Sequence, residues 1–95
     1  MLMASKEKVI LQLLCDGERY GLQLVEESGG RLKRGTVYVT LGRMEEKGYL
    51  HSRLEERAGE EGGLPRRLYR PTALGRRVLE AWVLVGRKLA FGGAR

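Results

Sequence analysis

Apolar residues recur at helical spacing in three successive stretches of the first half of the chain. These stretches cover residues 5–15, 20–28 and about 34–47, and a glycine-containing turn follows each of them. Each is therefore predicted to be a helix with one face toward a core. The inward positions are Val9, Ile10, Leu13 and Leu14 in the first; Leu22 and Val25, with Leu24 as a further candidate, in the second; and Val37, Leu41 and Met44 in the third.

A different pattern follows, in which polar and apolar residues alternate over residues 49–56. This period of two is typical of a half-buried strand. A glycine-rich turn at residues 58–63 separates it from a returning strand at residues 64–70. Because a two-stranded hairpin is unstable alone, we expect it to pack on the helices. The alternation places Leu50, Ser52 and Leu54 on one face.

A last helix is predicted from Thr72, its N-cap, to about Leu89. Its apolar stripe is wide for the end of a small domain, so two interpretations compete. The stripe either folds back on the first helix of its own chain or contacts a second copy, and its width favours the dimer. The predicted dimer contacts are Leu74, Val78, Trp82, Val85 and Leu89, and Leu79 and Val83 widen the stripe.

The predicted order of helix, helix, helix, hairpin and helix is that of a winged helix-turn-helix, a mainly α fold with a small β-hairpin as its wing. Ninety-five residues make one domain, and its core is thin because a chain this size buries only about two-thirds of its unfolded surface. We expect residues 1–72 to form the DNA-binding part and residues 73–91 the dimerisation helix of the same domain.

Charge narrows the class of partner. The chain has 18 basic and 12 acidic residues, a net charge of +6, which by itself points only weakly to nucleic acid. Residues 31–43 and 64–77, however, contain several bases and no acid. Such clustering is either an ordinary solvated surface or a face for an anionic partner.

Composition argues against several other classes of protein. No apolar run approaches the roughly 20 residues of a membrane span, and the N-terminus lacks the apolar core of a signal peptide. A single cysteine excludes an internal disulfide and fits a reducing cytoplasm. With one histidine, one cysteine and one aspartate, the chain offers no catalytic constellation and no metal site. We expect a cytoplasmic non-enzyme without cofactor, metal or membrane contact.

The third predicted helix has the side chains that a major-groove helix needs. With its apolar stripe inward, it turns threonines, a valine and an arginine outward. Arg43 can donate two bonds to a guanine edge, and threonine can bond a phosphate or a base. The alternative for Arg43 is a surface arginine paired with a nearby glutamate. The outward set is Thr36, Val39, Thr40 and Arg43, with Tyr38 to one side and Lys33 and Arg34 preceding the helix.

Three blocks of the sequence together resemble the PadR family of winged-helix transcriptional regulators. They are RYGLQLVEES (19–28), LKRGTVYVTLGRMEEKGYL (32–50) and GLPRRLYRPTALGRRVLEAW (63–82). The resemblance implies a homodimer that binds a palindromic operator on double-stranded DNA and usually represses. Many members release DNA when a small aromatic or drug-like effector binds near the dimer interface. The acidic wing tip at residues 59–62 departs from the basic tip that would suit a phosphate groove.

Position by position, the resemblance implies that Tyr38 faces the DNA backbone and that Arg66 and Arg67 are the basic residues of the wing. Tyr20 either bonds a phosphate or packs, and Trp82 either anchors the interface or stacks on an effector. A protein-binding winged-helix module is the competing hypothesis, and the bases near the third helix favour DNA. The DNA-binding candidates are Tyr20, Lys33, Arg34, Thr36, Tyr38, Thr40, Arg43, Arg66 and Arg67.

Overall fold

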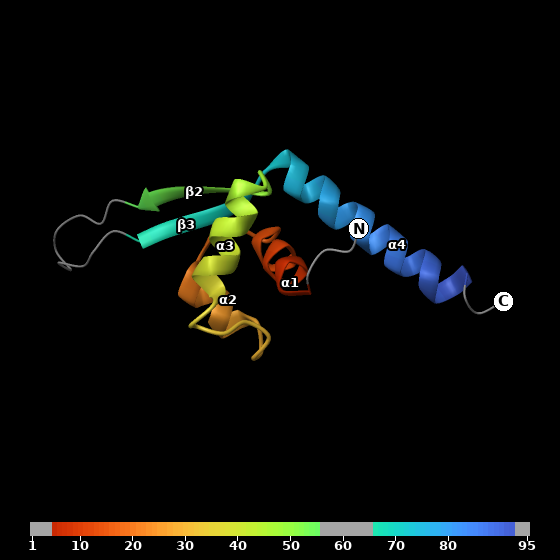
Figure 1. Cartoon of the computed structure of the whole chain (residues 1–95), viewed down its shortest axis with the longest axis horizontal. Helices are drawn as coiled ribbons and strands as arrows, with labels where there is room; N and C mark the ends of the chain where they lie inside the picture. Colours follow the sequence, from red (N-terminus) through yellow and green to blue (C-terminus); the bar gives the residue numbers. More distant parts are fainter. Residues whose placement is uncertain (1–4, 56–65, 93–95) are drawn as a thin grey trace.

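The computed structural model describes residues 5–55 and 66–92, with side chains as far as residue 86 (Figure 1). The predicted turn at 58–63, the first two residues of the returning strand and the side chain of Leu89 lie outside this part. The elements are α1 (Ser5–Leu14), β1 (Arg19–Tyr20), α2 (Gly21–Glu27), α3 (Val37–Glu46), β2 (Leu50–Glu55), β3 (Arg66–Pro71) and α4 (Ala73–Gly92).

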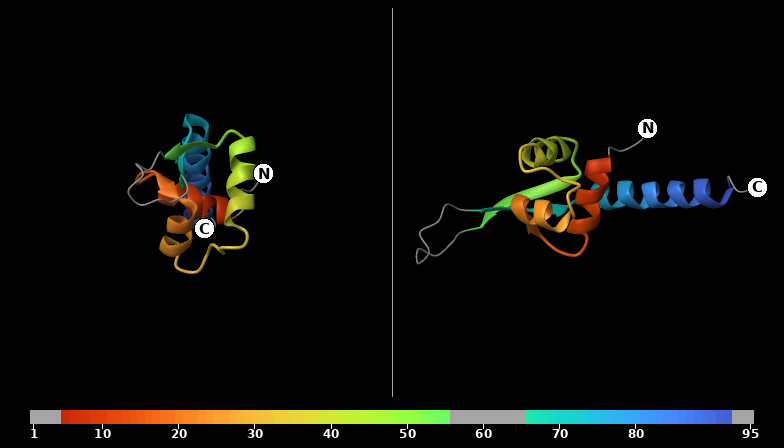
Figure 2. Two further views of the ribbon diagram at one scale, coloured as in Figure 1. Left: turned by 90° about the vertical axis from the view of Figure 1, so that its left-hand side faces the viewer. Right: turned by 90° about the horizontal axis from the view of Figure 1, so that it is seen from below.

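Helices α1, α2 and α3 cluster together at the centre of the molecule, with the sheet against them. From this centre the β2–β3 hairpin projects in one direction, and α4 projects in the other, as Figure 1 and the right-hand view of Figure 2 show. The arrangement is a winged helix-turn-helix, so the predicted fold class is confirmed.

One strand was not predicted. The two residues of β1 pair with β3 through Arg19↔Tyr69 and Tyr20↔Leu68, so the sheet has the order β1-β3-β2. Strand β3 is therefore central at this end of the sheet, whereas its first residues pair with β2 alone. The pairing ties the start of α2 to the wing, which positions Tyr20 beside it.

The core lies where the three central helices meet the sheet and the first half of α4. The buried face predicted for α3 is confirmed. In α2, Leu24 is fully buried and Val25 packs on the core as predicted, but Leu22, also predicted to face inward, is 40% exposed. Leu54 is also exposed, beyond the reach of the helices. The main core cluster is Ile10, Leu11, Leu14, Leu24, Leu32, Val37, Leu41, Met44, Leu50, Tyr69 and Leu79.

A polar joint connects the end of α3, both wing strands and the start of α4. The Thr72 hydroxyl donates to the Gly48 carbonyl oxygen at 2.6 Å, and the Thr72 N–H donates to the Tyr49 carbonyl oxygen at 2.9 Å. The same hydroxyl accepts from the Gly75 N–H at 2.9 Å, which confirms Thr72 as an N-cap. Gly75 itself is buried against Tyr49, and a Cβ there would collide with the Tyr49 carbonyl oxygen.

We expect Gly75→Ala to lower the free energy of unfolding by about 1–3 kcal/mol, because the Cβ would push α4 away from a backbone atom that cannot rotate aside. Urea denaturation measures the change. Gly42→Ala is the matched control, since a Cβ at Gly42 of α3 meets nothing within 4 Å and should stabilise by about 0.5–1 kcal/mol. Equal effects at the two positions would contradict a close approach at Gly75.

Candidate nucleic-acid interface

Lys33 and Arg34 lie in the turn that precedes α3 and not in the helix, which begins three residues later than predicted. The Lys33 carbonyl oxygen accepts from the Thr36 N–H at 3.2 Å and from the Val37 N–H at 2.9 Å, so this turn leads directly into the helix. Both basic side chains are exposed. Within the described residues neither forms an ion pair. Two cations therefore stand at the N-terminal end of α3.

One exposed side of α3 carries Thr36, Thr40 and Arg43, whose i, i+4, i+7 spacing aligns them along the helix. The Thr36 side chain makes no cap hydrogen bond, whereas the Thr40 hydroxyl donates to the Thr36 carbonyl oxygen at 3.2 Å. Arg43 is exposed and has no ion-pair partner in the described part of the chain. Val39, 55% exposed, lies beside this row.

Tyr38 points to the other side of α3, toward the wing. There it lines an open pocket of about 680 Å³ between α2, α3 and β3, which we term the wing groove. The tyrosine ring covers Gly21, where a Cβ would lie 2.5 Å from Cε1 and 2.7 Å from Cζ of Tyr38. Because Gly21 has no side chain, the Tyr38 ring can occupy the space beside it. The groove is lined by Tyr20, Gly21, Leu22, Gln23, Glu26, Tyr38, Arg66 and Arg67.

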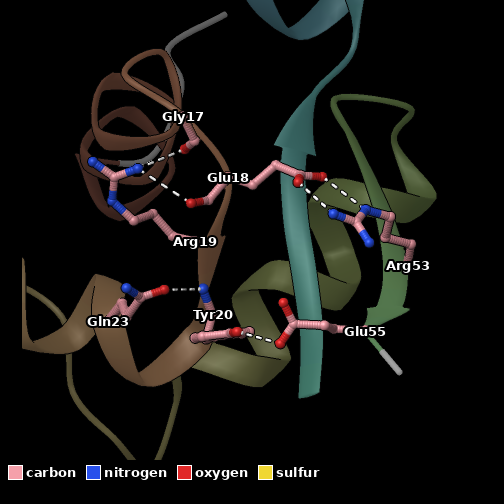
Figure 3. Close-up of polar contacts among 7 residues, drawn as sticks. All are labelled: Gly17, Glu18, Arg19, Tyr20, Gln23, Arg53 and Glu55. Carbon is pink, nitrogen blue, oxygen red and sulfur yellow. Dashed lines mark hydrogen bonds and ion pairs between the residues drawn. The ribbon is translucent and has the colours of Figure 1, made fainter. Parts of the chain in front are cut away.

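Tyr20 is held between α2 and the wing. Its N–H donates to Gln23 Oε1 at 2.8 Å, and its hydroxyl donates to the carboxylate of Glu55 at the end of β2 (Figure 3). This hydrogen bond raises the pKa of Tyr20 above its usual value. The guanidinium of Arg66 lies 4.8 Å from the centre of the Tyr20 ring, a cation–π contact. The Tyr20 hydroxyl thus already has an anionic partner within the chain.

The other basic wing residue contacts α3 indirectly. Arg67 Nη1 donates to Ser52 Oγ at 3.0 Å, and Ser52 Oγ donates to Glu45 Oε2 at 2.7 Å. This relay joins β3, β2 and α3 on the core side of the sheet. The structure therefore brings Tyr20, Tyr38, Arg66 and Arg67 together around the wing groove, whereas Thr36, Thr40 and Arg43 form a separate row.

Two acids near Tyr20 and Arg53, Glu55 and Glu18, were not predicted as part of the site. Arg53 donates to Glu18 through Nη2 at 2.8 Å and Nε at 3.2 Å, and these bonds lower the pKa of the Glu18 carboxyl (Figure 3). Glu55 lies directly opposite Arg66 in the register of β2 and β3. Tyr20 and Glu55 are 35 residues apart, and no local pattern signals their contact.

The predicted stripe on α4 is divided between the core and solvent. Leu79 is buried, and Val83 packs on the core, so one edge of the stripe folds back as the alternative prediction had it. Trp82 is half-buried, with Lys8 Nζ of α1 5.9 Å from its ring centre. Leu74 and Val85 are 45% and 44% exposed, and Val78 is half-buried between them.

Neither a metal site nor a membrane segment appears in the described part of the chain. Within residues 5–55 and 66–86 no group of three or more histidine, cysteine or acidic side chains is placed to hold a metal ion. Among the described helices none is long and apolar enough to cross a bilayer. Cys15, which follows the last residue of α1, is exposed and not part of the core.

Comparison with known proteins identifies the family. The family model of the transcriptional regulator PadR-like family matches residues 10–81, which is most of the chain. The chain therefore belongs to the PadR-like family, whose members are transcriptional regulators and not enzymes. A comparison with curated proteins found no match.

Solved structures agree with this assignment. A PadR family transcription regulator from Clostridium difficile R20291 is 28% identical, with a TM-score of 0.73, and the match covers 92% of this chain and 96% of that one. One from Eggerthella lenta DSM 2243 is 27% identical, with a TM-score of 0.75 and coverage of 93% and 77%. Bacillus subtilis PadR in complex with operator DNA has a TM-score of 0.76 at 21% identity. That match covers 87% of this chain, which spans about half of the Bacillus subtilis protein, 48%.

We expect Gly21→Ala to displace the Tyr38 ring from the wing groove, because the new Cβ and the ring cannot occupy the same space. The ring is exposed and can rotate away, so the free energy of unfolding should fall by less than about 1 kcal/mol. NMR shifts of the Tyr38 ring protons report the displacement. Gly35→Ala, which has open space around it, should leave them unchanged. Unaltered Tyr38 shifts in Gly21→Ala would contradict the contact.

Proposed function

We propose that this chain is a sequence-specific DNA-binding repressor that acts in the cytoplasm as a homodimer on a palindromic operator. In this proposal residues 1–72 bind DNA, and residues 73–91 form the dimerisation helix. The observation that carries the proposal is a set of exposed bases at α3 that form no ion pair with the described residues. They are Lys33, Arg34 and Arg43, and two wing arginines line a groove beside them.

The two sides of α3 support a division of contacts. Arg43, Thr36 and Thr40 form the row that would enter the major groove, where arginine and threonine read base edges. Tyr38 lies on the wing side, where it and the wing arginines would hold the phosphate backbone. The Bacillus subtilis relative was solved with operator DNA, and its similar fold supports the same mode of docking.

The exposed edge of α4 supports the dimer. Leu74 and Val85, with the half-buried Val78 between them, leave apolar surface that the described part of the chain does not cover. A second copy related by a two-fold axis would bury this edge and place two α3 helices on one palindrome. Trp82 lies beside this edge, so a small aromatic effector that stacks on it could alter the pairing of the two α4 helices.

Selection of bound sequences from a random duplex pool tests the proposal. The expected result is a palindrome with half-sites about one helical turn apart. Binding should weaken steeply with salt, with a slope of log affinity against log salt near −0.9 for each phosphate neutralised. An absence of measurable affinity for duplex DNA at low salt would overturn the proposal and favour the protein-binding hypothesis.

We expect Arg43→Ala to lose about 1–3 kcal/mol of affinity for the selected operator and less for random duplex, because it removes a base contact. Fluorescence anisotropy with labelled duplexes measures both. Lys33→Ala is the control, and as a phosphate contact it should weaken both duplexes by a similar factor. An equal loss on both duplexes for Arg43→Ala would demote Arg43 to a phosphate contact.

We expect Val85→Glu to raise the dissociation constant of the dimer at least about tenfold, which is about 1.4 kcal/mol, because a carboxylate would be buried unpaired between two apolar edges. Its helical circular dichroism should persist, because Val85 is 44% exposed within the chain. Sedimentation equilibrium measures the dissociation constant. Leu84→Glu is the control on a different side of α4, where the side chain is 55% exposed. Equal dissociation in both variants would contradict the predicted stripe.

A further inference from the structure

Tyr20 and Arg66 are in contact at the edge of the wing groove. Arg66 lies over the Tyr20 ring, 4.8 Å from its centre, and both residues line the groove. Tyrosine hydroxyls and arginine guanidinium groups are hydrogen-bond donors, and charge-assisted bonds from arginine to carboxylate or phosphate are strong. The pair therefore offers donors to an anion.

The chain supplies an anion of its own to this pair. The Glu55 carboxylate accepts from the Tyr20 hydroxyl (Figure 3). Glu55 also lies opposite Arg66 in the β2–β3 register. Three other acids of the described residues form ion pairs, namely Glu7 with Lys47, Glu18 with Arg53 and Glu27 with Arg19. Glu55 forms no ion pair with a base of the described residues. Its carboxylate therefore lies against the hydroxyl of Tyr20, a residue that lines the groove, without a neutralising base among the described residues.

We propose that Glu55 competes with DNA phosphate for the Tyr20 hydroxyl and Arg66, and so lowers the affinity of the wing for any duplex. The inference rests on the proposed DNA binding. A phosphate entering the groove must displace the carboxylate, which then repels it from nearby. Such a cost is useful in a protein of net charge +6, because genomic DNA presents a large excess of non-specific sites that would otherwise hold it.

The competing role for Glu55 is purely structural. Its hydrogen bond to Tyr20 links β2 to the start of α2, so it could simply hold the wing in position. The two roles predict opposite signs. If Glu55 positions the wing, its replacement weakens DNA binding. If it competes with phosphate, its replacement strengthens binding, and the gain depends on the Tyr20 hydroxyl.

The test compares affinities for random duplex DNA at one fixed salt concentration. Glu55→Gln keeps an oxygen that accepts from Tyr20 but loses the charge, so affinity should rise about two- to fivefold, the effect expected of one exposed charge pair. Glu55→Ala should change affinity in the same direction. In a Tyr20→Phe background the gain should shrink. Glu18→Gln makes the same charge change on the same side of the sheet but outside the groove, and should gain less.

The possible results separate failure of the competitor role of Glu55 from failure of the proposed DNA binding. Unchanged or weaker binding by Glu55→Gln would overturn the competitor role, as would a gain no larger than that of Glu18→Gln. A gain of the same size with and without the Tyr20 hydroxyl would also overturn it, because a general charge effect would then be sufficient. Failure of the wild-type chain to bind duplex at low salt would instead remove the proposed function, and the inference with it.

Discussion

The arrangement of the molecule depends on the joint at which α3, the wing and α4 meet. Thr72 bonds the Gly48 and Tyr49 carbonyl oxygens with its hydroxyl and its N–H, and it caps α4 with the same hydroxyl. Gly75 allows the first turn of α4 to touch the Tyr49 carbonyl. Because β2 starts at Leu50 and β3 ends opposite it at Pro71, one small cluster of bonds sets the directions of both the wing and α4 relative to α3.

The fold brings some acidic side chains to basic ones and leaves other bases without an acidic partner among the described residues. Two acids that lie near the sheet and in the first helix form ion pairs with bases, Glu18 with Arg53 and Glu7 with Lys47, and the latter bond raises the pKa of Lys47. Exposed pairs of this kind contribute little to stability. Their larger effect is to leave uncompensated positive charge at particular places, namely the turn before α3 and Arg43.

Much of the fold could be predicted from sequence because its signals are local. The stripe of Val37, Leu41 and Met44 identified α3 and its buried face, and the Thr72 cap fixed the start of α4. Helix α2 has seven residues, too few for its periodicity to distinguish Leu24 from Leu22. Packing against the rest of the core decides which face of α2 is buried.

The candidate site was only partly predictable for a similar reason. The bases and Tyr38 could be picked out individually, but their grouping depends on contacts between distant residues. Gly21 has to be seen beneath the Tyr38 ring before its role is clear. Likewise β1 is two residues long, and its pairing with β3 is what brings Tyr20 to Glu55. A strand that short has no sequence pattern of its own.

The apolar stripe of helix α4 serves the core along one edge and is exposed along the other. A 20-residue helix extends about 30 Å, farther than the three central helices reach. Leu79 and Val83 use one edge of the stripe to close the core of the chain. The neighbouring edge, with Leu74 and Val85, stays exposed in the same helix. Folding and the proposed pairing therefore do not compete for side chains, since each takes a different edge, and Trp82 lies between the two.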